Sequence, residues 1–310
     1  MDAEAAELAD ESDKILHYQR SYALSAYSTS LFCKAEGLRF SRYVIQSKTM
    51  VYIALTIAGS DPSGGAGIQA DLKTFHQRGV YGTSVLTLVT VQNTREVRAV
   101  ETLPPALVAA QLDAVLEDIP PDAAKTGALG DPEIVRLLAQ KASSFEFPLV
   151  VDPVMVSKHG QPLMSETARI QMVQQLLPRA SLVTPNLHEA AELACMPVND
   201  LAGMKEAAVK IAALGAKSVL IKGGHLEGDA VDVLYWKREW LYYRAPRIET
   251  LHTHGTGCTY SACITAELAK GREIPDAVGI AKRFITAAIQ TNPNLGKGCG
   301  PVNHHAVIDE

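Results

Sequence analysis

The sequence predicts an α/β fold in which an open, mostly parallel β-sheet lies between two layers of helices. From residue 50 onward, short apolar runs alternate with stretches of helical spacing, and each apolar run ends in glycine or small polar residues. Repeated β-α-β order is typical of a parallel sheet with helices on both faces. Because no low-complexity linker interrupts the sequence after residue 50, we expect residues 50–310 to form one domain.

The first elements follow from apolar patterning and from the placement of prolines. Residues 51–59 (VYIALTIAG) form a short apolar run that suits a buried parallel strand entering a turn. A helical stretch near 66–78 precedes a long expected strand over 81–92. Residues 104–118 have helical spacing, and their two prolines stand at the first turn, where a missing N–H group costs little.

The second half of the domain continues the alternation of strands and helices and then is expected to form a hairpin followed by two helices. Four further strands are expected, each separated from the next by helical sequence, in the segments AAKTGAL, FPLVVDPVM, ASLVTP and AKSVLIKGG. Residues 229–246 have alternating apolar positions around the tripeptide LysArgGlu, a pattern that predicts a β-hairpin. Two helices, over about 256–270 and 275–290, are expected before a glycine-rich tail.

Residues 1–49 differ from the domain that follows them. Their acidic start and their tyrosine- and serine-bearing stretch lack sustained periodicity, so we expect a disordered or loosely helical N-terminal extension. A secretory signal needs basic residues followed by an apolar segment. This start instead carries acidic side chains at positions 2, 4, 7, 10 and 11, which argues against an export or organelle-transit signal.

Composition and charge exclude several classes of partner. The 29 Lys and Arg residues are outnumbered by 34 Asp and Glu residues, which gives a formal charge of -5, so the basic footprint of a duplex-binding protein is missing. No run reaches the roughly 18 apolar residues of a membrane-spanning helix. The five cysteines contain no CxxC pair, which favours a reducing compartment over a disulfide framework. We therefore expect a cytoplasmic protein with no nucleic-acid partner and no membrane partner.

Polar residues and glycines follow several of the expected strands. In an open α/β sheet, ligands bind beyond the carboxyl ends of the strands. The segments at that edge are GSDPSGGAG (59–67), Gln92 with Asn93, Asp152, ThrProAsn (184–186), LysGlyGly (222–224) and HisGlyThrGlyCys (254–258). Neither GxxxxGK[ST] nor GxGxxG occurs among them, which argues against a P-loop or a dinucleotide site.

The segment HGTGCTYSACITAELAKG has the clearest chemical content. Gly255 and Gly257 flank Thr256, and helical spacing begins immediately afterwards. The amides of residues 255–258 are therefore expected to converge at a helix N-terminus, where phosphate and developing negative charge are stabilised. Cys258 lies in the first turn, where the same field is expected to lower the thiol pKa. We expect Cys258 to act as a base or a hydrogen-bonding partner for an acceptor hydroxyl.

The segments AGSDPSGGAGIQADLKTF, VQNT, DPVM, TPNLHEA, KGGH and HGTGCTYSA, in this order, resemble the hydroxymethylpyrimidine/phosphomethylpyrimidine kinase family of thiamine biosynthesis. The resemblance covers about residues 51–307 and implies a three-layer α/β/α ribokinase-like fold. It also implies ATP-dependent phosphorylation of 4-amino-5-hydroxymethyl-2-methylpyrimidine and then of its monophosphate, which gives the diphosphate.

The resemblance assigns substrate-binding residues. Gln92 would pair with the exocyclic amino group and a ring nitrogen, because a carboxamide has both a donor and an acceptor. Gly59 and Ala66 would lie against the ring, and Asp71 near the polar edge of the substrate. Val154 would contact the ring. Many family members have methionine where this chain has Ala128, which implies a smaller wall on that side of the pocket.

The resemblance also assigns the nucleotide side of the site. Lys222 and Gly223 would lie beside the ATP phosphates. Asn186 and Glu189 have the spacing with which the superfamily positions magnesium, through water, and they would also form a helix capping box. Asp152 would be a further partner of the metal. The γ-phosphate of MgATP would lie over the amides of residues 255–258.

Two other functions remain open at this point. Pyridoxine or pyridoxal kinase activity occurs on closely similar chains that carry the GTGC motif. A pyrimidine-binding sensor without activity would have no need for the phosphate-binding residues, which argues against it. The family also suggests a homodimer, although the aromatic side chains of the expected hairpin, Trp236, Trp240 and Tyr242, could equally pack within one chain.

Overall fold

The computed structural model describes residues 51–158, 160–224 and 228–309. Residues 50–310 form one compact unit, and the secondary structure given below belongs to it. The predicted N-terminal extension, residues 1–49, lies outside the described residues.

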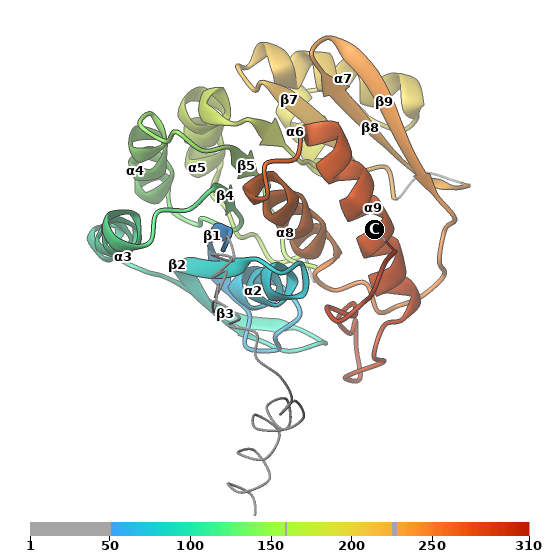
Figure 1. Ribbon diagram of the computed structural model, residues 1–310, viewed down its shortest axis with the longest axis horizontal. Helices are drawn as coiled ribbons and strands as arrows, with labels where there is room; N and C mark the ends of the chain where they lie inside the picture. Colours follow the sequence, from blue (N-terminus) through green and yellow to red (C-terminus); the bar gives the residue numbers. More distant parts are fainter. Residues whose placement is uncertain (1–50, 159, 225–227, 310) are drawn as a thin grey trace, which may run out of the picture. The chain divides into compact units, whose positions relative to one another are not determined.

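The described residues contain one sheet of nine strands, in the order β3-β2-β1-β4-β5-β6-β7-β8-β9 (Figure 1). The six strands β2, β1, β4, β5, β6 and β7 pair in parallel, whereas β3, β8 and β9 are antiparallel to their neighbours. The prediction of a mostly parallel sheet is confirmed. The strands are β1 (Ile53–Ser60), β2 (Tyr81–Gln92), β3 (Val97–Thr102), β4 (Ala123–Thr126), β5 (Leu149–Val151), β6 (Leu182–Val183), β7 (Ser218–Ile221), β8 (Ala230–Trp236) and β9 (Glu239–Ala245).

Helices cover both faces of this sheet and complete three layers. Alternate residues of one strand enter two separate cores, as β1 shows: Leu55 and Ile57 pack in one core and Ala54 in the other. The first core is covered by α3 (Pro105–Asp118), α4 (Pro132–Ala142), α5 (Glu166–Gln171), α6 (Leu187–Ala194) and α7 (Leu201–Ala213). The second is covered by α2 (Gly67–Gln77), α8 (Thr256–Ala269) and α9 (Ile274–Gln290). In the part of the chain described, no helix has the length and apolar character to cross a bilayer.

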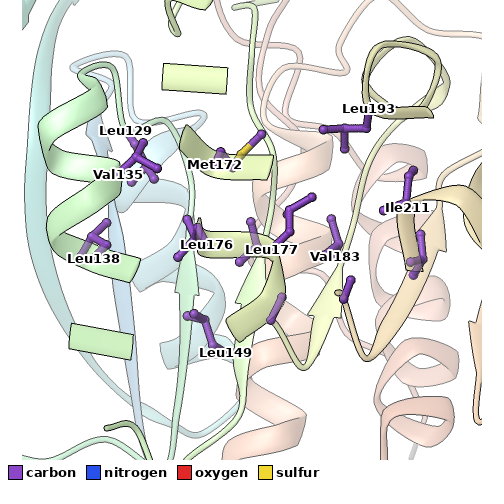
Figure 2. Packing of buried hydrophobic residues seen from close by; sticks show 14 of the residues in the cluster. Leu129, Val135, Leu138, Leu149, Met172, Leu176, Leu177, Val183, Leu193 and Ile211 are labelled. Atoms are coloured by element: carbon purple, nitrogen blue, oxygen red, sulfur yellow. The ribbon is translucent and has the colours of Figure 1, made fainter. Parts of the chain in front are cut away.

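The first core is built from large aliphatic side chains. A π-helical turn (Met172–Leu176) and a 3-10 turn (Leu177–Arg179) continue α5 toward β6. Figure 2 shows Leu176 and Leu177 of these turns among side chains from α4 and from the neighbouring strands. This packing holds the helical segment between β5 and β6 against the sheet.

The strand β3 (Val97–Thr102) was not predicted. Its sequence VRAVET carries two charged side chains, and most of its residues are exposed or half-buried. It lies at the edge of the sheet, antiparallel to β2. Edge strands commonly carry charges that discourage pairing with other chains, and for this reason the apolar pattern that marks an interior strand is missing.

The hairpin of β8 and β9 confirms the prediction for residues 229–246. Lys237 and Arg238 form its tip, and both have positive φ angles, 49° and 65°, as two-residue hairpin turns require. The Lys237 ammonium lies 3.9 Å from the centroid of the Trp236 ring, and Trp240 stacks on Tyr235 with ring centroids 4.7 Å apart. Both tryptophans therefore have partners within the chain.

The second core should depend strongly on Phe284 of α9, which has no exposed surface. We expect Phe284→Ala to lower the free energy of unfolding by about 3–5 kcal/mol, because it removes a large buried ring and leaves a cavity. Urea denaturation followed by circular dichroism measures the change. Leu251→Ala is the control, since Leu251 is 80% exposed and its loss should change stability by less than about 0.5 kcal/mol. Equal stability of the two variants would contradict the described core.

Candidate active site

Two glycine-containing turns meet at the carboxyl-terminal edge of the sheet. Gly255 is the N-cap of α8 and has a φ of 76°. A Cβ atom at this position would overlap the carbonyl oxygen of Gly65, so glycine is required both for the backbone conformation and for the close approach. The contact brings the turn after β1 against the start of α8.

The amides at the start of α8 differ in their engagement. The Thr256 N–H donates to the Thr253 carbonyl at 3.3 Å, so this amide already has a protein partner. Among the described residues, no hydrogen bond occupies the amides of Gly255, Gly257 and Cys258. A Cβ atom on Gly257 would lie 3.4 Å from Lys222 Nζ and 3.9 Å from Asp152 Oδ2. The first turn of α8 therefore lies directly beside a cation and a carboxylate.

Cys258 lies in the first turn of α8, as predicted, but the expected effect on its thiol is wrong. Burial raises the pKa of Cys258 to about 12; the charges of Asp71 and Asp152 also raise it, while Lys125 and the Gly67 N–H that donates to the sulfur oppose the shift. The helix field does not compensate for lost hydration. Cys258 is therefore a protonated thiol at neutral pH and not a ready base.

A buried ion pair lies beneath the thiol. Lys125 Nζ is 2.8 Å from Asp71 Oδ2, and neither side chain has exposed surface. Asp71 also accepts a hydrogen bond of 2.6 Å from Thr56 Oγ1. Burial alone would lower the pKa of Lys125, but the negative charges of Asp71 and Asp152 hold it above its usual value, so the pair is ionic. Asp71 itself has no exposed surface, and its place near the polar edge of the substrate stays a prediction.

A second ion pair joins two residues that were assigned to the nucleotide side. Lys222 Nζ lies 2.9 Å from Asp152 Oδ1, which also accepts a hydrogen bond from Thr184 Oγ1. The other carboxylate oxygen, Oδ2, accepts a hydrogen bond from Ser261 Oγ of α8 at 3.1 Å. Asp152 thus connects the ends of β5, β6 and β7 with α8. The binding of phosphates beside Lys222 and of a metal ion beside Asp152 stays a prediction.

Asn186 and Glu189 form the predicted capping box of α6. The Asn186 side chain accepts from the Glu189 N–H, and the Glu189 carboxylate accepts from the Asn186 N–H. Burial raises the pKa of Glu189 to about 7, with a further contribution from the negative charge of Asp152, while Lys222 opposes the shift. Two carboxylates that repel each other beside one ammonium group provide a place where added positive charge would be stabilised.

The position of Gly223 is fixed by a residue of the antiparallel strand β8. Its N–H donates to Asp232 Oδ1 of β8 at 2.9 Å. Asp232 Oδ2 accepts from Tyr260 of α8 at 3.0 Å and from Lys282 of α9 at 2.7 Å. A Cβ atom on Gly223 would overlap the carbonyl oxygen of Val231. The turn that follows β7 is therefore held against the hairpin and both C-terminal helices.

The predicted substrate side gathers around His254. Gln92, at the end of β2, lies 3.1 Å from His254 through their Nε2 atoms. His254 Nε2 also lies 2.7 Å from Asp61 Oδ2. Burial would raise the pKa of Asp61, but hydrogen bonds from His254 and Ser63 more than offset this, so the pKa lies below its usual value. Asp61 is therefore a carboxylate.

The remaining predicted residues fall into two groups. Gly59 is the penultimate residue of β1, and Ala66 belongs to the turn that follows, in which the Ala66 N–H donates to Asp61 and Gly67 packs against the Gly59 carbonyl. Val154 is half-buried two residues beyond Asp152, and no contact of the described residues joins it to Gln92. Its role at the ring stays a prediction.

Sequence reasoning assigned no role to Asp61, Lys125 or His254. Asp61 and His254 stand inside motifs that were recognised for their glycines, and their pairing spans 193 positions of the chain. Lys125 had a local signal that could have found it. It is a charged residue inside the apolar segment AAKTGAL, and a lysine in a strand buried on both faces needs a carboxylate partner.

The raised pKa of Glu189 predicts a pH-dependent stability. Because this carboxyl binds its proton more tightly in the folded than in the unfolded chain, its stabilising contribution is present at low pH and is lost as the pH rises through about 7. Between pH 5 and pH 8, the wild type should lose on the order of 1–3 kcal/mol of unfolding free energy relative to Glu189→Gln. Denaturant unfolding at each pH measures this, and Glu117→Gln, an exposed change on α3, is the control. Parallel profiles for the wild type and Glu189→Gln would contradict the raised pKa.

Solved structures of known kinases have the same fold. A pyridoxal kinase from Bacillus subtilis, solved as an ADP complex, superimposes with a TM-score of 0.78 and 43% identity and covers 83% of this chain and 98% of its own. A phosphomethylpyrimidine kinase from Clostridium difficile 630 has a TM-score of 0.69 and 45% identity, and covers 77% of this chain and 99% of its own.

Sequence comparison identifies the family. A hydroxymethylpyrimidine/phosphomethylpyrimidine kinase from Streptomyces coelicolor is 47% identical over 258 residues, which is 83% of this chain and 96% of that protein. The model of the family described as phosphomethylpyrimidine kinase matches residues 61–303. Each glycine-containing turn of the site lies within that match. The chain therefore belongs to the phosphomethylpyrimidine kinase family, which has the ribokinase-like fold.

Proposed function

We propose that the protein transfers the γ-phosphoryl group of ATP to the hydroxymethyl group of 4-amino-5-hydroxymethyl-2-methylpyrimidine and then phosphorylates the resulting monophosphate. One observation carries the proposal. The unoccupied amides and the thiol at the start of α8 lie between a cation–carboxylate pair on one side and the carboxamide of Gln92, reached through His254, on the other. This arrangement supports a phosphate-binding turn between a nucleotide half-site and a pyrimidine half-site. The protein would work in the cytoplasm as a homodimer.

The chain's own groups would stabilise the transfer mainly by position and charge. The bond from the phosphorus to the β-phosphate oxygen breaks while a bond to the alcohol oxygen forms, and the alcohol proton passes late to an oxygen of the transferred phosphoryl group, which releases it to solvent. Such a loose transition state needs oriented reactants and donors for the phosphoryl oxygens more than it needs a strong base. The amides of Gly255, Gly257 and Cys258, together with Lys222 Nζ, would supply those donors.

A protonated thiol suits this mechanism. Because burial raises the pKa of Cys258 to about 12, the sulfur would orient the alcohol by hydrogen bonding and would not remove its proton before transfer begins. The Gly67 N–H that donates to the sulfur and the Lys125–Asp71 pair beneath it would fix its position. Of the two roles expected from the sequence, a base or a hydrogen-bonding partner for the acceptor hydroxyl, this mechanism uses the second.

Magnesium fits the residues present on the nucleotide side. Among the described residues, no group of three or more acidic, histidine or cysteine side chains forms a protein cage for a metal ion. Magnesium keeps much of its hydration shell and is usually held by one or two carboxylates together with substrate phosphates. Asp152 and Glu189 would hold it through water, and the ion would neutralise charge on the phosphates. Asn186 would orient Glu189 through the capping box.

A coupled assay of ADP formation tests the function on the full chain. We expect turnover with the pyrimidine alcohol and with its monophosphate, dependent on magnesium, and a kcat/KM at least about 10-fold lower with pyridoxal. A higher kcat/KM with pyridoxal would favour the activity named for the Bacillus subtilis neighbour. The absence of ADP formation with any of the three compounds would leave a binding protein as the better description.

The role of Cys258 has its own test. Cys258→Ser should lower kcat by about 10-fold or more, because the shorter, harder hydroxyl changes the position of the hydrogen bond to the alcohol. It should leave the Kd of the pyrimidine within about threefold. Cys195→Ser is the control, since Cys195 is exposed at the end of α6. Near-normal turnover of Cys258→Ser would remove the thiol from the mechanism.

A further inference from the structure

The carboxamide of Gln92 lies between two polar groups at the end of β2. Gln92 Nε2 is 3.1 Å from His254 Nε2, and Gln92 Oε1 is 3.3 Å from Thr90 Oγ1. A half-turn about the terminal torsion of the side chain exchanges the nitrogen and the oxygen and moves no other group. The hydrogen-bond balance of the two neighbours decides which of these orientations is the stable one.

His254 faces Gln92 with a donor. Asp61 Oδ2 accepts hydrogen bonds from the amides of Gly65 and Ala66, at 3.2 and 2.9 Å, and it is a carboxylate, so it has no proton to give. His254 Nε2, 2.7 Å from the same oxygen, must therefore carry the hydrogen. With the NH2 group of Gln92 on this side, two donors would face each other, whereas its carbonyl oxygen can share the His254 hydrogen.

Thr90 faces Gln92 with an acceptor. A threonine hydroxyl has one hydrogen, and the hydroxyl of Thr90 donates it to the Ser60 carbonyl of β1 at 3.0 Å. Toward Gln92 the hydroxyl therefore presents lone pairs, which accept from an NH2 group and repel a carbonyl oxygen. Thr90 is buried, with 7% of its surface exposed, so water does not replace this interaction. Both neighbours therefore favour the turned carboxamide, with its oxygen toward His254 and its NH2 group toward Thr90.

We propose that His254 and Thr90 are positioning residues that lock the Gln92 carboxamide, with its oxygen toward His254 and its NH2 group toward Thr90, and that this lock sets the choice between pyrimidines. The inference rests on the proposed function and deepens it. Asp61 and Ser60 support this arrangement: the Asp61 carboxylate accepts the hydrogen of His254, and the Ser60 carbonyl accepts that of Thr90.

The lock has a defined consequence for the substrate. The outward edge of the carboxamide keeps one N–H and one carbonyl lone pair in a fixed order. A 4-aminopyrimidine matches this order with its ring nitrogen and its amino group. A 4-oxopyrimidine with a protonated ring nitrogen presents the reversed order. The ring cannot turn over, because its hydroxymethyl group must point toward the start of α8. A locked carboxamide rejects the 4-oxo compound, and a free one can rotate to accept it.

The test compares the Kd values of two compounds by isothermal titration calorimetry. They are 4-amino-5-hydroxymethyl-2-methylpyrimidine and 5-hydroxymethyl-2-methylpyrimidin-4-one. In the wild type the amino compound should bind about 100-fold more tightly or better, since each reversed contact costs roughly 10-fold. That ratio should fall by about 10-fold or more in Thr90→Val and in His254→Gln, whose own amide can present either atom. Thr83→Val is the matched control, because Thr83 also lies on β2 and donates to a β1 carbonyl, that of Ala54.

The possible results distinguish a failure of the proposed Gln92 lock from a failure of the proposed kinase function. A ratio that stays within about twofold of the wild type in Thr90→Val and His254→Gln, even if both Kd values rise together, would mean a merely structural role and would overturn the lock. If His254→Gln does not fold, Thr90→Val alone decides. A wild type that neither binds nor phosphorylates the amino compound would overturn the proposed function itself, and this inference with it.

Discussion

Gly255 packs so closely against the carbonyl of Gly65 that no side chain fits between them, and the rest of the site depends on this contact. It brings the turn after β1 against the first turn of α8, although about 190 residues separate the two in the sequence. The same contact positions Cys258 beside the Gly67 amide and His254 beside Asp61. One steric constraint, satisfied only by glycine at a positive φ, therefore assembles both the proposed phosphate side and the proposed pyrimidine side.

Around this contact the fold buries an unusual amount of charge. The pair of Lys125 with Asp71 and that of Lys222 with Asp152 both lie near the first turn of α8. Buried ion pairs contribute little net stability, because the loss of hydration offsets their attraction. Their retention in a site that handles phosphates is better explained by positioning: a fixed ammonium group needs no reorganisation when negative charge arrives. Glu189 completes the arrangement as a carboxyl whose proton is held by burial.

The sequence predicted the parallel core, the helices and the hairpin, because their periodicity reflects burial that is local to each element. It missed β3, whose side chains are too exposed to leave an apolar pattern. In the site, residues beside glycines and strand ends were found, since backbone geometry leaves a local mark. Partnerships across the chain were not: the pairing of His254 with Asp61 and that of Lys125 with Asp71 depend on tertiary contact. The thiol pKa of Cys258 was predicted in the wrong direction because helix position is visible in the sequence and burial is not.

The antiparallel strand β8 contacts the proposed nucleotide side through one carboxylate, that of Asp232. Asp232 of β8 receives the Gly223 N–H on one oxygen and the Tyr260 and Lys282 side chains on the other. Through Asp232, the hairpin therefore links the backbone beside Lys222 to the two C-terminal helices α8 and α9. This constrains the evolution of the hairpin: a relative in which the hairpin was shortened so that Asp232 was lost would need another carboxylate to anchor the loop after β7.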